Sequence, residues 1–209
     1  MAASVALVSS VVVCAEGATA PDRGQANLNG LILRAAQVGT GYRLQQRPDG
    51  HGARGYVTLD LCGFTFPSES LRTGRLQVNY AHSGTAPQLS NEVVAYRAGD
   101  AQQALREVTR AARHCPRGPV GSNVKGVPPL TYQVSEISDT RLLPQHLALR
   151  IHYSGTIKGR HREETIIGVY QIRRDVLSGV YAYGSSVAER IRVGLHAAEE
   201  SAKNLKRPA

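Results

Sequence analysis

The sequence is poor in several residue types, and each shortage removes a class of protein. Its 209 residues include no Trp, one Met, two Phe and three Cys. Three cysteines are too few for a small disulfide-rich scaffold and the wrong number for a four-ligand zinc site. No apolar run reaches the roughly 18 residues that a membrane-spanning helix needs. With 42% hydrophobic residues, the chain is expected to form one globular domain of ordinary size.

Recognised catalytic motifs are also missing. The sequence has no Gly-x-Ser-x-Gly elbow, no P-loop, and no Gly-x-Gly-x-x-Gly motif that follows a strand and opens a helix. His114 and Cys115 are neighbours, but adjacent helical residues point about 100° apart and cannot readily form a nucleophile–base pair. His146 and His152 share a strand face about 20 Å apart, too far to bind one metal ion. We therefore predict no catalytic residue, no metal site, no cofactor and no enzymatic activity.

Residues 2–13 form an uncharged apolar run that small residues follow. About a dozen apolar residues are too few to cross a bilayer but match the hydrophobic core of a secretory signal peptide. Residues 13–15 and 18–20 both resemble cleavage sites, and Cys14 is a candidate for lipidation. We assign residues 1–20 to a signal-peptide-like segment and residues 21–27 to a linker. The alternative is that residues 2–13 form a buried strand or helix of the domain.

The other two cysteines are Cys62 and Cys115. An even pair in an exported protein predicts a disulfide. The alternative is two free buried thiols in a cytosolic protein.

Three segments have the apolar spacing of amphipathic helices, namely residues 28–39, 99–116 and 185–206. In the second helix, Asp100 is the expected N-cap, and Gln103 completes a capping box. Its apolar stripe ends at Cys115, which places this sulfur on the inward edge of the last turn. Ser186 and Glu189 form the capping box of the third helix.

Strands are predicted from alternating or continuous apolar runs at residues 74–83, 91–99, 130–138, 146–154, 164–174 and 178–185, with another that begins near Tyr42. The order lacks the strand–helix alternation of a doubly wound fold. The fold class predicted is α+β, an antiparallel sheet of about five to six strands with helices packed on one face. This single domain spans residues 28–205, and residues 206–209 form a tail.

The net charge is +9 and the pI is near 9.8. One interpretation is nucleic-acid binding through phosphate contacts and base stacking. The residues for it are Arg150, Arg173, Arg174, Tyr80, Tyr96 and Tyr170. The basic residues are spread along the chain, however, so no nucleic-acid partner is expected. The other interpretation is solubility and attraction to anionic envelope polymers or lipid headgroups, which would give peripheral membrane association.

If the sheet carries a ligand site, its polar face is the expected place. The candidate ligand-binding residues are Arg75, Gln77, Asn79, Arg150 and His152, with Tyr181 and Tyr183 alongside. They alternate out of phase with the apolar residues of their own strands. The alternative is that this face is simply solvated.

Three sequence segments resemble a known family. They are LILRAAQVGTGY, LDLCGFTFPSESLRTGRLQV and LSNEVVAYRAGDAQQALREVTRAARHCP. Together they resemble secreted and lipid-anchored actinobacterial proteins related to the extracellular sensor domain of PknH-type receptor Ser/Thr kinases. The resemblance covers about residues 28–204 and implies an antiparallel sheet with helices on one side, a cleft, and a ligand. The sensor domain has more than one disulfide, whereas Cys62 and Cys115 allow only one here.

The sequence therefore predicts an exported, envelope-associated, non-catalytic domain that binds a small ligand or an envelope component. It would be secreted or lie at the outer face of the cell membrane. Without a kinase domain, any signalling output would pass through a separate protein. The alternatives are a small envelope hydrolase or isomerase with a cone-like cavity, and a nucleic-acid-binding protein.

Overall fold

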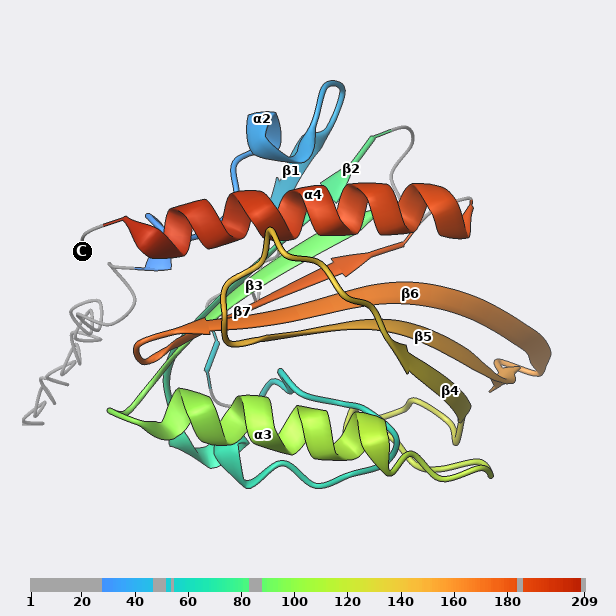
Figure 1. The fold of residues 1–209 in the computed structure, drawn as a ribbon. Coiled ribbons are helices and arrows are strands. Elements are labelled where there is room, and N and C mark those ends of the chain that lie inside the picture. Colours follow the sequence, from blue (N-terminus) through green and yellow to red (C-terminus); the bar gives the residue numbers. More distant parts are fainter. Residues whose placement is uncertain (1–27, 47–51, 54, 83–87, 184–185, 208–209) are drawn as a thin grey trace, which may run out of the picture.

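A computed structural model describes residues 28–46, 52–53, 55–82, 88–183 and 186–207 (Figure 1). The signal-peptide-like segment, the linker and Cys14 lie outside these residues, as do the last two residues of the predicted tail. None of the helices in the described part of the chain has the length and apolar character needed to cross a membrane.

The described residues form one antiparallel sheet in the order β1-β2-β3-β7-β6-β5-β4. The strands are β1 (Arg43–Gln46), β2 (Arg72–Ala81), β3 (Leu89–Tyr96), β4 (Thr131–Glu136), β5 (His146–Ile157), β6 (Arg160–Arg173) and β7 (Val176–Ala182). The helices are α2 (Ala35–Val38), the short 3-10 helix η1 (Pro67–Leu71), α3 (Asp100–Arg113) and α4 (Val187–Lys206). The predicted antiparallel α+β class is confirmed, with seven strands instead of five to six.

The two long helices pack on opposite faces of the sheet (Figure 1). Along β6, Val169 packs in the cluster that contains α4, whereas the next residue, Tyr170, packs in the cluster that contains α3. Successive side chains of a strand point to opposite faces, so the two clusters lie on either side of the sheet. We call these sides the α4 face and the α3 face. The prediction of helices on one face is therefore wrong.

Helices cover both faces of the sheet because its central strands are apolar on both sides. Six successive residues of β6, from Ile167 to Ile172, are buried, and β3 is buried along almost its whole length. A strand covered on one side only would alternate between buried and exposed residues. Both faces of the sheet centre therefore need a helix to keep them from water.

The segment from Leu28 to Gly39 is mostly not helical, which corrects the prediction for 28–39. Within it, the described helical residues are Leu28 and the short helix Ala35–Val38. The Leu33 N–H donates to Asn91 Oδ1 at 2.9 Å, and the Asn204 side chain contacts the carbonyl of Ile32 at 3.3 Å. These long-range bonds satisfy backbone groups that a helix would have paired internally.

The cap of α3 also differs from the prediction. Gly99, in the left-handed region at φ 87°, is the N-cap, and Asp100 is the first helical residue. Gln103 donates to Glu107 at 2.7 Å instead of completing a capping box. Ser186 is the N-cap of α4 as predicted, because its Oγ accepts the Glu189 N–H at 3.2 Å, while the Glu189 carboxylate binds Arg192.

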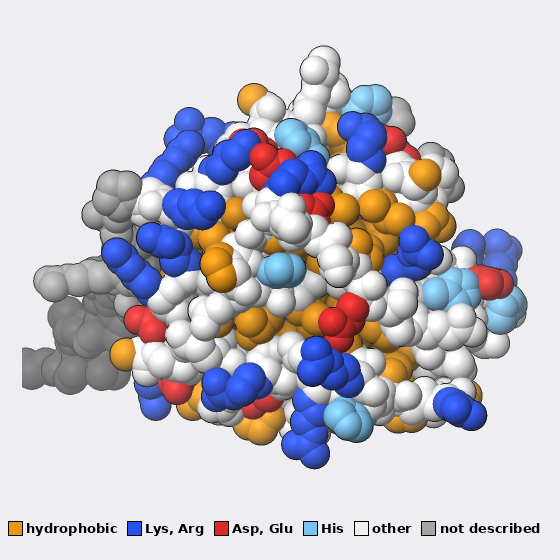
Figure 2. All heavy atoms as spheres, in the orientation of Figure 1, with side chains coloured by type: hydrophobic (Ala, Val, Ile, Leu, Met, Phe, Trp, Pro, Cys, Tyr) orange, Lys and Arg blue, Asp and Glu red, His pale blue; other side chains and the backbone are white. Residues whose placement is uncertain are grey.

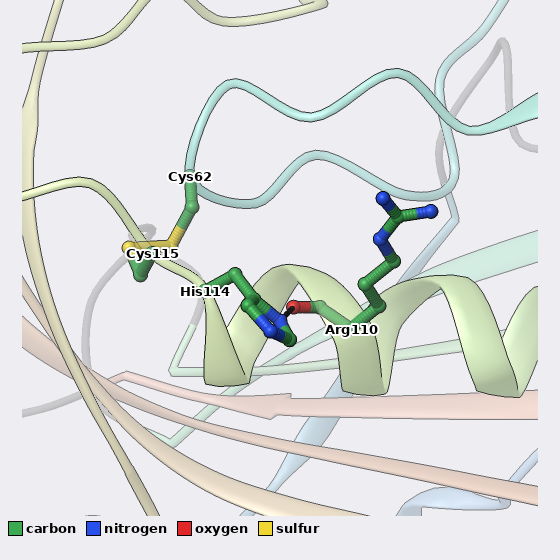
Figure 3. The surroundings of a disulfide bond; sticks show 4 residues. All are labelled: Cys62, Arg110, His114 and Cys115. Atoms are coloured by element: carbon green, nitrogen blue, oxygen red, sulfur yellow. Dashed lines mark hydrogen bonds between the residues drawn. A yellow bond between two sulfur atoms is a disulfide. The ribbon is translucent and has the colours of Figure 1, made fainter.

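The disulfide between Cys62 and Cys115 is confirmed (Figure 3). The two Cα atoms are 5.2 Å apart, and 53 positions separate them in sequence. The bond joins the end of α3 to the segment that precedes η1. Next to it, His114 Nδ1 contacts the Arg110 carbonyl at 2.9 Å, so this ring completes the helix end and does not pair with the sulfur.

Candidate ligand-binding pocket

A pocket of about 510 Å³ lies where the turn between α2 and β1 meets the first half of α4. Its walls are Val38, Gly39, Thr40, Tyr42, His82, Gln88, Tyr183, Glu189, Arg192, Val193 and His196. These residues come from five separate parts of the chain, which the ends of β2, β3 and β7 bring together. The volume is within the usual range for a small-molecule site, roughly 300–1,000 Å³.

Backbone and side-chain hydrogen bonds of Gln88 hold the sheet side of the pocket. Its carbonyl accepts the Tyr183 N–H at 2.8 Å, and its Oε1 accepts the His82 N–H at 3.2 Å. The Gln88 N–H itself donates to the Tyr80 carbonyl at 2.8 Å. One residue therefore fixes the positions of two ring-bearing wall residues.

The opposite rim is the glycine-containing turn 39–41. Gly41 has φ 82°, in the left-handed region, and a Cβ at this position would lie 3.0 Å from His82 Nε2. Glycine is therefore required both by the backbone conformation and by the close approach of the His82 ring. Immediately after the turn, the rings of Tyr42 and His82 lie 5.1 Å apart at 59°. The turn thus places two rings side by side at the pocket.

The helical wall carries the charges. Glu189 and Arg192 form a two-point ion pair, with contacts of 2.7 and 3.0 Å. The Arg192 guanidinium lowers the pKa of Glu189, and His82 adds to this effect. Burial raises the pKa of Tyr42, and the negative charge of Glu189 raises it further, while Arg192 opposes this. Tyr42 is therefore a neutral phenol at ordinary pH and can donate a hydrogen bond.

Basic, acidic and histidine side chains lie close together near the top of the molecule, over the region where the α2–β1 turn approaches α4 (Figure 2). Beneath them, Val38 and Val193 are buried and give the pocket an apolar part. Tyr42, His82 and Tyr183 offer ring surfaces, and Gln88, His196 and Thr40 offer hydrogen-bonding groups. This combination suits a small polar molecule that has one flat face.

The seven residues predicted to form a polar sheet face do not lie on one face. Arg75 pairs in the sheet with Val94, which packs on the α3 face, whereas Arg150 pairs with Ile167, which packs on the α4 face. Paired residues of neighbouring strands share a face. Gln77, Asn79 and Tyr181 therefore lie with Arg75, and His152 lies with Arg150.

Arg75 is part of a buried network. It forms an ion pair with Glu92 and donates to Gln77 Oε1 at 2.5 Å. Thr58 Oγ1 donates to Glu92 at 2.9 Å, and Arg72 in turn donates to Thr58 at 2.7 Å. Arg75 is 3% exposed and does not face solvent, while Glu92 and Arg72 hold the segment around Thr58 against the sheet.

Three of the remaining predicted residues contact other side chains of the protein itself. Asn79 Oδ1 accepts from Ser90 at 2.7 Å, and the Tyr181 ring packs edge-on against Tyr170 at 5.7 Å. His152 contacts Thr165 at 3.0 Å and Glu163 at 3.0 Å. Arg150 is exposed on the other face.

Tyr183 is the one of the seven that lines the pocket. The other wall residues were not predicted, because they lie in loops and on a helix and share no periodic pattern. The one sequence feature that could have indicated this pocket is the Gly39-Thr40-Gly41 turn, which has two glycines in three residues.

The tyrosines of the nucleic-acid interpretation are buried. Tyr80, Tyr96 and Tyr170 are 0%, 4% and 3% exposed and cannot stack on bases. Within the part of the chain that the structure describes, no group of three or more His, Cys, Asp and Glu side chains could hold a metal ion.

Comparison with known proteins identifies the fold. The chain is similar in structure to the extracellular domain of PknH from Mycobacterium tuberculosis. The TM-score is 0.55 over 86% of this chain and 96% of that domain, with 12% sequence identity. No family model matches the sequence, and a search of curated proteins finds no match. At this identity the similarity concerns the fold.

Proposed function

We propose that this protein is an exported, non-catalytic domain that binds a small polar ligand between the α2–β1 turn and α4. The observation that carries the proposal is the 510 Å³ pocket, whose wall combines the rings of Tyr42, His82 and Tyr183 with hydrogen-bonding groups. A flat sugar or aromatic ring would stack on the rings while Gln88 and His196 bind its polar groups.

Export has two supports. The Cys62–Cys115 disulfide is a bond that persists in oxidising compartments and is rare in the cytosol. The protein of similar fold is an extracellular domain.

The non-catalytic assignment rests on how the pocket's ionisable groups are used. Glu189 is bound to Arg192, and their side chains are 46% and 69% exposed at the rim. A general acid or base needs a partner that tunes its pKa toward neutrality, whereas Arg192 lowers the pKa of Glu189. This ion pair therefore fits a role in binding better than one in proton transfer.

The test is an NMR titration of the His82 and His196 ring signals with small fragments that each carry one sugar or aromatic ring. We expect fragments that shift both signals, because both rings line the pocket. Replacing the exposed rim residue Thr40 by Trp should fill the pocket and abolish these shifts, whereas Arg150→Gln on the exposed sheet surface should not. Should no fragment shift the two signals, or should Thr40→Trp leave the shifts unchanged, the proposal fails.

A further inference from the structure

Five basic residues lie on chain segments that adjoin one another at the end of the molecule where α4 finishes. They are Arg97, Arg173, Arg174, Lys206 and Arg207, which we call the cationic end. Figure 2 shows Lys and Arg side chains gathered toward the side of the molecule on which α4 ends (left in Figures 1 and 2).

The β6–β7 turn contributes two of the five, and the adjoining β3–α3 connection contributes Arg97. Arg173 is the last residue of β6, and Arg174 follows in the left-handed conformation at φ 53°. The carbonyl of Asp175 accepts the Tyr96 N–H at 2.8 Å, and its side chain accepts the Gly99 N–H at 2.8 Å. These two bonds tie the connection that carries Arg97 to the turn.

The end of α4 contributes the other two. Leu205, in its last turn, packs with Leu143 and Val176, and Lys206 and Arg207 follow directly. Leu143 also lines a surface groove together with Arg173 and Arg174. The end of α4 and the β6–β7 turn therefore adjoin through Leu143.

The basic residues of the cationic end outnumber the acids beside them. Among the described residues, none of the five forms an ion pair, and the neighbouring Asp175 carboxylate accepts the Gly99 N–H. Some other basic side chains, namely Arg72, Arg75, Arg141, Arg192 and Lys203, are paired with carboxylates. A surface that keeps its positive charge uncompensated attracts anions.

The chain also enters the domain at this end. Leu28 begins the described residues, and Leu31, one turn later, packs with Leu143 and Leu205. The apolar run 2–13 precedes it in sequence, joined through residues 14–27. A lipid attached at Cys14, the lipidation candidate, would be separated from Leu28 only by residues 15–27, which would keep this end of the domain near the headgroups.

We propose that the cationic end binds anionic phospholipid headgroups and orients the domain with this end toward the membrane. The proposal rests on the export proposed above, which would bring the domain to a membrane surface, and is independent of the ligand pocket. Each Lys or Arg near an anionic surface strengthens binding about fivefold. In this orientation the pocket, formed by the first half of α4, would face away from the lipid.

The test measures partition of the full chain between buffer and vesicles. One set of vesicles contains equal amounts of phosphatidylglycerol and phosphatidylcholine, and the other contains phosphatidylcholine alone. The ratio of the two partition coefficients removes the contribution of the apolar run, which is common to both. We expect Arg173→Gln/Lys206→Gln/Arg207→Gln to lower this ratio on the order of a hundredfold at low salt.

The matched control removes the same charge from the tip of the β5–β6 hairpin. In Lys158→Gln/Arg160→Gln/Arg162→Gln three exposed basic residues are replaced, and the net charge falls equally. This control should keep the wild-type ratio within a few-fold.

Equal losses in the two triple variants would show that net charge alone matters and would overturn the proposal. An unchanged ratio in the cationic-end variant would overturn it as well. So would a loss of binding to DNA in that variant with vesicle binding retained, because the partner would then be a soluble polyanion. Retained fragment binding in the pocket would separate these failures from a failure of the proposed function.

Discussion

Arg75 and Glu92 form an ion pair that lies on the α3 face of the sheet, with their side chains 4% and 3% exposed. Two neighbouring strands present them, and Thr58 donates a further hydrogen bond to Glu92. Charged groups this deeply buried are tolerated only when each has its partner and its hydrogen bonds. The pair therefore connects the loop around Thr58 to the sheet and explains why a residue expected at a binding surface is internal.

Glu92→Gln is expected to destabilise the protein strongly. It leaves the buried guanidinium of Arg75 without a counter-charge, which costs about 3–5 kcal/mol in comparable cases. Urea unfolding measures the loss. The control is Glu136→Gln, which breaks the exposed pair of Arg113 and Glu136 and should change the free energy of unfolding by less than about 1 kcal/mol. If both variants lost a similar free energy of unfolding, burial would not be what makes the Arg75–Glu92 pair sensitive to substitution.

Removing the disulfide should lower the free energy of unfolding by roughly 4 kcal/mol, because the crosslink closes a long loop in the unfolded chain. The variant is Cys62→Ala/Cys115→Ala, measured by urea unfolding. A reductant should shift the midpoint of the wild type and leave that of the double variant unchanged. A wild type with the same midpoint with and without reductant would argue against the bond.

Gly41→Ala is expected to cost about 1 kcal/mol and to displace the His82 ring. The positive φ disfavours any residue with a Cβ, and the new Cβ would lie 3.0 Å from His82 Nε2. Gly126→Ala is the matched control, because Gly126 has φ 85° but open space around it. Both variants should lose stability, but only Gly41→Ala should change the His82 ring signals in NMR spectra. An unchanged His82 environment would contradict the described packing.

Tyr132 should contribute to alkaline unfolding. Burial, aided by the charge of Asp60, raises the pKa of Tyr132 to about 12 from its ordinary value of 10.0. Above pH 10 the unfolded chain loses this proton before the folded protein does, so stability falls as pH rises from 10 to 12. Tyr132→Phe has no proton to lose, and its free energy of unfolding should fall less steeply over this range. If the free energy of unfolding fell equally with pH in wild type and variant, the raised pKa of Tyr132 would be contradicted.

The cysteine pairing and most strands follow from the sequence because they depend on local or countable features. Two cysteines remain after the first, and the apolar stripe predicted for residues 99–116 ends at Cys115, just beyond the last residue of α3. The alternation in β2 correctly separated Leu76 and Val78 from Arg75 and Gln77. A period of two in a strand records which residues share a face of that strand, and nothing more.

The pairing register decides which residues of different strands share a face of the sheet. Arg75 and Arg150 each lie opposite the apolar residues of their own strand, yet the register places them on opposite faces of the sheet. The reason is that the two faces bury different apolar sets, one under α3 and one under α4. In β5 the apolar set that includes Leu149 faces α3, whereas in β2 the set that includes Val78 faces α4.

The sequence by itself determined the antiparallel α+β class, the disulfide and the Ser186 N-cap of α4, because short-range spacing and residue type govern these features. Tertiary structure alone decided three others: the placement of α3 and α4 on opposite faces, the burial of Arg75, and the pocket. The pocket joins residues as distant as Tyr42 and His196, and only the packing of helix on sheet brings them together. Side chains that meet through long-range packing leave no periodic signal in the chain.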